Sequence, residues 1–141
     1  MENEQASADV SGVLHQLAER YGAMDAEGVL ALFAGDDTVL VGTGADEVRF
    51  GMAATRAQVE RDMSQADEVS FGIENLRVSV FGDAAFGYAD ATFAGSAGGT
   101  PFEIPGRWTT GLVRTEDGWL IVQFHVSVAY EEQAEGESFP G

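Results

Sequence analysis

Two side chains that can donate hydrogen bonds to an organic molecule stand out in this chain, Tyr21 and Arg107. Tyr21 ends the apolar stripe of an expected helix, so its hydroxyl could donate to an oxygen atom of a ligand. Arg107 precedes an expected strand, and its planar guanidinium can bind a carboxylate or another anion through paired hydrogen bonds. Each residue also has a structural interpretation, as a core tyrosine with a satisfied hydroxyl and as a surface arginine in ion pairs.

Other chemistry is limited by the residue types present. There is no cysteine, which excludes thiol catalysis, disulfides and cysteine-ligated metal centres. The two histidines, His15 and His125, are far apart and lack the spacing of a metal-binding motif. The acidic residues at 36–37 and 46–47 are explained by capping, turn and solvation roles. We therefore expect no metal and no cofactor, and the sequence identifies no catalytic set.

Composition predicts one globular domain with an acidic surface. The 141 residues carry 24 acidic and 7 basic side chains, which gives a formal net charge of -17. This charge argues against binding to nucleic acid or to an anionic membrane, because both depend on cations placed against phosphates. All basic residues are arginine, a pattern that fits either a salt-rich cytoplasm or an arginine-favouring genome. The polar N-terminus and the lack of a long apolar segment favour a cytoplasmic location.

Apolar spacing in the first half predicts helices that must position Tyr21. The segment 7–21 has apolar residues at steps of three and four, and Asp25 can cap a second short helix that ends near Gly35. A short strand is expected over 38–42 and a third helix over about 52–64. Residues 1–6 and the acidic segment 131–141 are expected to be disordered, which leaves 7–130 as the domain.

The second half alternates with a period of two and predicts four strands in two hairpins. Gly82-Asp83 and Asp117-Gly118 are the expected two-residue turns. In the first hairpin, Arg77 would lie opposite Tyr88, on the outer face. The second turn would place Glu116 opposite Trp119. Its inward face would then carry Arg107 and Thr109 with Phe124 and Val126, and its outward face Trp108 with Gln123 and His125. Small inward residues, such as Gly87, would either enlarge a cavity or pack against the helices.

Several segments, in this order, resemble the SnoaL-like branch of the nuclear transport factor 2-like superfamily. They are 30–37 (LALFAGDD) with Val39, 42–48 (GTGADEV) with Gly51, and 115–122 (TEDGWLIV) with 125–127 (HVS). The last strand is also similar to the association domain of calcium/calmodulin-dependent kinase II. The resemblance implies an α+β fold in which a cone-shaped, curved antiparallel sheet has its concave face covered by three N-terminal helices. It also implies an interior pocket and a homodimer formed through the outer face of the sheet.

The resemblance implies no single activity, because this fold hosts many functions. Matching the segments places the carboxylate base of ketosteroid isomerase at Gly42, so that activity is not expected. We expect a small organic ligand in an apolar pocket, with Arg107, Tyr21, Phe124, Val126 and Thr109 as ligand-binding residues. The homodimer interface is expected to contain Trp108, Gln123, His125 and Tyr88. Two alternatives are a lyase, isomerase or cyclase acting on such a molecule, and a non-catalytic association module.

Overall fold

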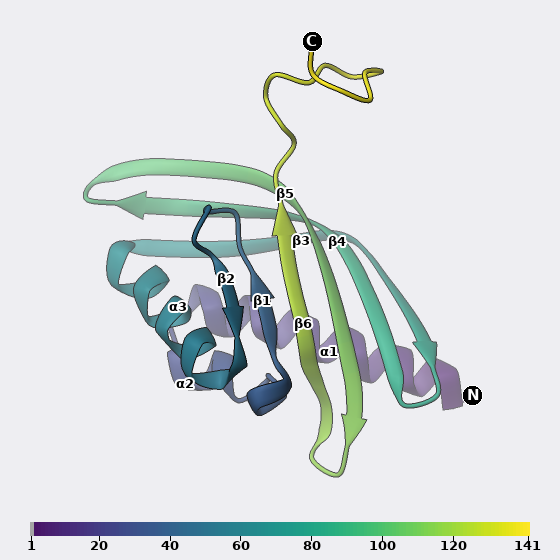
Figure 1. Ribbon diagram of the computed structural model, residues 1–141. Helices are drawn as coiled ribbons and strands as arrows, with labels where there is room; N and C mark the ends of the chain where they lie inside the picture. The colour runs from purple at the N-terminus through teal and green to yellow at the C-terminus, as the bar shows by residue number, and fades with distance from the viewer. Residues whose placement is uncertain (1) are drawn as a thin grey trace.

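The apolar stripe of the first helix extends almost to the beginning of the chain. The computed structural model describes residues 2–141, and helix α1 spans Glu2–Gly22 (Figure 1). Ala6 and Leu14 lie on the buried face of α1 and are 4% and 0% exposed. The prediction of disorder over residues 1–6 is therefore wrong for 2–6, because Ala6 anchors this turn in the core, while Met1 lies outside the described residues. No helix in residues 2–141 has the length and hydropathy needed to cross a bilayer.

The second helix begins where the sequence predicts, but it ends at Leu30 and not near Gly35, because Phe33 instead forms a bridge with Ile121. Helix α2 (Ala26–Leu30) begins after Asp25, whose Oδ1 accepts a hydrogen bond of 2.9 Å from the Gly28 amide. Its buried residues include Val29, which faces the core. A short 3-10 helix, η1 (Gly35–Asp37), leads into the first strand, and helix α3 (Gly51–Gln65) covers the predicted segment 52–64.

The strands form one curved sheet that does not close on itself (Figure 1). Their bounds are β1 (Val39–Val41), β2 (Val48–Phe50), β3 (Glu68–Phe81), β4 (Ala84–Ala97), β5 (Thr100–Thr115) and β6 (Gly118–Ser127). Within residues 2–141 their order is β2-β1-β6-β5-β4-β3. The α+β prediction is confirmed. Two details differ, since β2 was not expected and β1 pairs with β6 in parallel, Val39 lying beside Gln123.

The first hairpin has the predicted register near its turn. Arg77 lies opposite Tyr88, as the Gly82-Asp83 turn predicts. A bulge between Glu74 and Arg77 then shifts the pairing, and Asn75 has a positive φ of 55° there. Asp90 consequently lies opposite Glu74, although the Asn75 side chain still donates a 2.7 Å hydrogen bond to its carboxylate.

The second hairpin has a different register, and this changes which face of β5 points inward. Its two-residue turn is 116–117, because Thr115 pairs with Gly118 and its Oγ1 accepts a 3.1 Å hydrogen bond from the Asp117 amide. Val122 forms a bulge on β6. Leu112 pairs with Ile121 and Gly111 pairs with Gln123, so Val122 has no partner on β5. One extra residue on β6 exchanges the faces of β5 relative to those of β6. Trp108 therefore lies opposite Val126 and faces the core.

Small residues of β4 allow α1 to lie close to the sheet. Ala85 and Ala89 are fully buried, and a Cβ on Gly87 would be 2.9 Å from Cδ1 of Leu14. These residues do not line the large cavity described below. Of the two predicted roles for them, close packing against a helix is the one observed.

Candidate ligand-binding cavity

A cavity of about 340 Å³ lies between helices α1 and α3 and the concave face of the sheet. Most of its wall is apolar, and the aromatic residues that line it are Tyr21, Phe33, Phe71, Phe93, Phe102 and Phe124. Its polar lining includes Thr43, Glu47, Gln58, Asp62 and Gln65. The volume is in the range of pockets that bind small organic molecules.

Stacked rings form the apolar side of the cavity. Phe71 of β3 and Phe93 of β4 lie face to face, with ring centroids 4.6 Å apart and an interplanar angle of 11°. Tyr21 contacts both rings edge-on, at centroid distances of 6.2 and 6.0 Å. Because the sheet register places Phe71 directly opposite Phe93, β3 and β4 fix this wall and leave the hydroxyl of Tyr21 free to point elsewhere.

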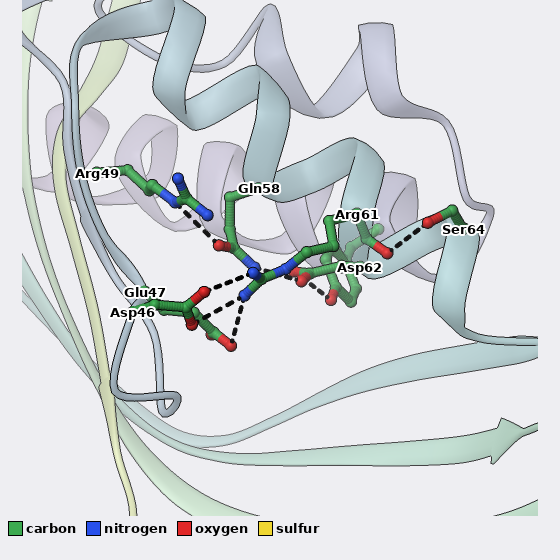
Figure 2. A network of polar contacts seen from close by, with 8 residues as sticks. Asp46, Glu47, Arg49, Gln58, Arg61, Asp62 and Ser64 are labelled. Atoms are coloured by element: carbon green, nitrogen blue, oxygen red, sulfur yellow. Dashed lines mark hydrogen bonds and ion pairs between the residues drawn. The ribbon is translucent and has the colours of Figure 1, made fainter.

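The polar side of the cavity is a chain of hydrogen bonds centred on Asp62 of α3. The hydroxyl of Tyr21 donates to Asp62 Oδ2 at 3.0 Å, and Gln58 Nε2 donates to Oδ1 at 2.7 Å. Gln58 is 1% exposed, and its Oε1 accepts a 3.1 Å hydrogen bond from Arg49 Nε. Figure 2 shows Gln58 and Asp62 on the same side of α3, with Arg49 reaching Gln58 from the neighbouring hairpin. Both oxygens of Asp62 are therefore oriented by donors.

A second carboxylate reaches the cavity from the loop between β1 and β2. The side chain of Glu47 lies against Gly42 and Gly44, where a Cβ at either position would collide with its carboxylate. Arg61 of α3 holds this loop through contacts of 2.7 Å with Asp46 and 3.3 Å with Glu47 (Figure 2). The two glycines thus leave the room that the Glu47 carboxylate occupies. This acid lies beside the position that the family resemblance assigns to a carboxylate base.

Burial controls the electrostatics at Asp62. Loss of solvent raises the pKa of the Asp62 carboxyl above its ordinary value, and the nearby charge of Glu47 acts in the same direction. Hydrogen bonds from Gln58 and Tyr21 and the charge of Arg61 lower that pKa but do not offset the burial. The pKa of Tyr21 is also raised, mainly by burial and then by the charge of Asp62, so its hydroxyl keeps its proton. The site therefore holds a phenol donor and a carboxyl group that resists ionisation.

The structure separates the predicted ligand-binding residues into two groups. Tyr21, Phe124 and Val126 line the cavity. Arg107 and Thr109 are exposed on the opposite face of β5, so their predicted inward orientation is wrong. The reason is the bulge at Val122, which the pattern of alternating residues does not reveal.

The same change of register places the predicted interface residues on different faces of the sheet. Trp108 is 1% exposed and packs 5.1 Å from Phe71 between ring centroids, so its predicted place on the outer face is wrong. Gln123 and His125 are exposed on the outer face, and Tyr88 lies there with its hydroxyl donating a 2.6 Å hydrogen bond to Asp90. None of these residues lines the cavity.

Sequence reasoning missed the polar group that the cavity contains. Asp62 and Gln58 are four residues apart on α3, and they flank Val59 on its buried face. A polar pair on the apolar stripe of a helix was the available signal for this site. The position of Glu47 had no such signal, because it depends on how the loop folds over Gly42. Among residues 2–141, no group of three or more histidine, aspartate or glutamate side chains converges as metal ligands.

The curved sheet covered by helices has the nuclear transport factor 2-like class of fold. Within this class, the family model of the SnoaL-like domain matches residues 10–131. The chain belongs to the SnoaL-like family. No curated protein sequence was found to match it.

Solved structures with the same fold are distant in sequence. A nuclear transport factor 2-like superfamily protein from Salmonella enterica has a TM-score of 0.85 and 16% identity, covering 96% of this chain and 99% of the other. A candidate dehydratase of the same superfamily from Streptomyces avermitilis has a TM-score of 0.83 and 18% identity, covering 90% and 98%. A candidate association domain of calcium/calmodulin-dependent kinase II from Xanthomonas campestris has a TM-score of 0.76 and 22% identity, covering 86% of each chain. At these identities the likeness shows the fold alone.

Proposed function

We propose that the protein binds a small organic molecule in the cavity between α1, α3 and the sheet. The hydrogen-bonded pair Tyr21–Asp62, set in a wall that is otherwise mostly apolar, is the observation that carries this proposal. A ligand with an apolar body would pack against the aromatic rings, and its polar group would face Asp62 and Gln58. Small-molecule sites typically combine such a wall with a few converging polar groups.

The cavity also bears on the alternative that the protein is a non-catalytic association module. A purely structural association module has no need for an open interior, so a cavity of about 340 Å³ supports a binding role over that one. Because ordinary packing leaves few voids larger than a water molecule, the volume itself is a reason to expect an occupant.

Native mass spectrometry of the protein purified from its own source tests the binding proposal. We expect a small molecule to remain bound to the wild type and to Arg107→Ala, because Arg107 lies on the face away from the cavity. Ala66→Phe should lose it, because Ala66 lines the cavity and a larger ring there takes up the space. An empty wild-type protein that also binds no member of a library of small aromatic compounds would contradict the proposal.

A second candidate is a lyase, isomerase or cyclase acting on the same ligand. Such reactions need proton transfer, and a carboxyl whose pKa is raised by burial can exchange a proton nearer neutral pH than an exposed one. The hydroxyl of Tyr21 at 3.0 Å from Asp62 would orient or polarise an oxygen of the substrate. The candidate dehydratase from Streptomyces avermitilis shares the fold but has only 18% identity, so its name adds context and no assignment.

Incubating the recovered ligand with the protein separates binding from catalysis. A catalytic role predicts that the wild type converts the ligand to an isomer or to a product of altered mass, and that Asp62→Asn binds it without converting it. Glu60→Gln, a change on the exposed side of the same helix, serves as the control. A ligand recovered unchanged from the wild type would leave the binding role without the catalytic one.

We also propose that two copies of the chain associate through the outer face of the sheet. Phe86 is 56% exposed there, on the same side of β4 as Tyr88, and Gln123 and His125 are exposed on the same face. Mixed surfaces with aromatic anchors are typical of such interfaces. Light scattering at high salt should give twice the chain mass for the wild type and the single mass for Phe86→Asp. A wild-type monomer under these conditions would contradict the homodimer.

A further inference from the structure

We propose that the ligand's polar group is a protonated amine, so that the cavity binds a small organic cation with an apolar, preferably aromatic, body. This inference rests on the proposed binding function and adds the chemical class of the ligand. Three observations carry it: the state of the Asp62 carboxylate, the signs of the charges in the cavity wall, and the rings that face them.

Asp62 lacks a cation of its own. Its two oxygens accept hydrogen bonds from Tyr21 and Gln58, which are neutral groups. Within the described residues 2–141, Asp62 takes part in none of the ion pairs, since Arg61, its neighbour in sequence, contacts Asp46 and Glu47. Asp62 is partly buried, and a carboxylate removed from water is normally paired with a cation, because desolvation of an unpaired charge is costly. A ligand that carries a cation supplies the missing partner.

The hydrogen bonds around Asp62 suit the ionised form of the carboxylate. Both Tyr21 and Gln58 act as donors to it, and an ionised carboxylate accepts hydrogen bonds at several further lone pairs. An ammonium group in the cavity can therefore donate to Asp62 without displacing either neighbour. Burial and the nearby charge of Glu47 raise the pKa of Asp62 and so work against its ionisation, and a bound cation would lower that pKa.

The charges in the cavity wall have one sign. The carboxylates that line it are Asp62 and Glu47, and among residues 2–141 no arginine or histidine lines it. Arg49 and Arg61 lie outside the lining, with Arg49 bonded to Gln58 and Arg61 to the 46–47 loop. The chain as a whole has a formal charge of -17, which raises the local concentration of cations over that of anions. Both the carboxylates in the cavity wall and the net charge of the chain would disfavour an anionic ligand.

The aromatic wall adds a second attraction for a cation. The Phe71–Phe93 stack and Tyr21 border the same cavity as Asp62. The face of an aromatic ring attracts an ammonium group by about 0.5–2 kcal/mol, and more strongly when water is excluded. A ring-bearing amine can thus place its body on the aromatic wall and its nitrogen at Asp62.

Binding of three matched compounds tests the inference by isothermal titration calorimetry. The compounds are 2-phenylethylamine, 2-phenylethanol and phenylacetate, which are cationic, neutral and anionic at neutral pH. We expect the wild type to bind the amine at least about tenfold more tightly than the alcohol, and the carboxylate least. Asp62→Asn should lower the affinity for the amine by a larger factor than the affinity for the alcohol, and so remove the preference for the amine. Glu60→Gln, which removes a charge from the exposed side of α3, should keep the preference.

Each outcome supports the inference or overturns it. Equal or weaker binding of the amine relative to the alcohol overturns it and leaves the proposed binding function intact. Such a result would mean that Asp62 is protonated and donates a hydrogen bond to a neutral acceptor on the ligand. The inference is also overturned if Asp62→Asn keeps the preference for the amine, or if Glu60→Gln removes it. In either case the acidic surface, and not Asp62, would attract the amine. Binding of none of the three compounds overturns the inference, while the retained-ligand experiment decides the function separately.

A measurement on the wild type makes the test independent of variant folding. The titratable and charged groups that face Asp62 are Tyr21 from α1, Glu47 from the β1–β2 loop and Arg61 from α3. Because Asp62 must be ionised to pair with the amine, affinity for the amine should fall as acid protonates Asp62, whereas affinity for the alcohol should change little. Parallel pH profiles for the two compounds would overturn the inference.

Discussion

Leu14 of α1 lies directly over Gly87 of β4, so closely that a Cβ on Gly87 would be 2.9 Å from Leu14 Cδ1 and 2.7 Å from Thr110 Oγ1. Replacing Gly87 with alanine should force the buried side chains of Leu14 and Thr110 to move. We expect Gly87→Ala to reduce the free energy of unfolding by about 1–3 kcal/mol, as overpacking of a core does. Urea denaturation measures the change. An unchanged midpoint would mean that α1 is less tightly seated than the structure indicates.

Gly12 gives the opposite prediction on the same helix. It lies in the middle of α1, and a Cβ there meets nothing within 4 Å. Alanine removes the entropic cost of a helical glycine, so Gly12→Ala should increase the free energy of unfolding by about 0.5–1 kcal/mol. The same urea titration compares it with Gly87→Ala. Destabilisation would show that Gly12 makes a contact that this structure lacks.

The position of Trp108 tests the register of the second hairpin. Because Trp108 is buried beside Phe71, Trp108→Ala should cost about 3–5 kcal/mol of stability. Thr109→Ala is the control, since Thr109 is exposed and should change stability by less than about 0.5 kcal/mol. Chemical denaturation of both variants distinguishes this register from the one the turn sequence suggests. A larger effect at Thr109 than at Trp108 would favour the latter.

The partly buried carboxyl of Asp62 should make stability depend on pH. Its pKa is raised in the folded state, so the folded protein binds more protons than the unfolded chain between the unfolded value, about 3.9, and the raised one. Over that interval the contribution of Asp62 to stability falls as pH rises. Asp62→Asn lacks this loss, so its stability relative to the wild type should increase from pH 4 to pH 7.

Denaturant titrations of both proteins across that range provide the measurement. Glu27 and Asp46 have pKa values lowered mainly by hydrogen bonds from Arg56 and Arg61, and they act in the opposite direction. They are present in both proteins, so their effects cancel in the difference. A stability difference that is constant with pH would show that Asp62 ionises as an exposed aspartate does.

The sequence predicts the fold well where a local signal determines an element. The period of apolar residues identifies α1 and α3, the Asp25 cap marks the start of α2, and Gly82-Asp83 sets the register that places Arg77 opposite Tyr88. These features depend on residues close together in the chain. The parallel pairing of β1 with β6 has no such local signal, and it was not predicted.

The candidate site was harder to predict because small local shifts decide it. One bulged residue, Val122, moves Arg107 and Thr109 away from the cavity and brings Trp108 into the core. The acids at the cavity come from α3 and the β1–β2 loop, which are distant in sequence from β5 and β6, and Glu47 enters only because Gly42 leaves it room. The spacing of apolar residues predicts which positions face the core, but it does not predict which groups a polar residue at such a position contacts.

The pairing of β1 with β6 affects when the cavity can form during synthesis of the chain. Residues 39–41 form one wall together with residues 123–125, and Phe33 bridges to Ile121 beside them. During synthesis, a chain that has reached only β5 has the helices and most of the sheet but lacks the strand that joins them. Closure of such distant contacts is slow relative to local helix formation. The side of the cavity lined by Leu40 and Phe124 therefore cannot form before residues 118–127 have been synthesised.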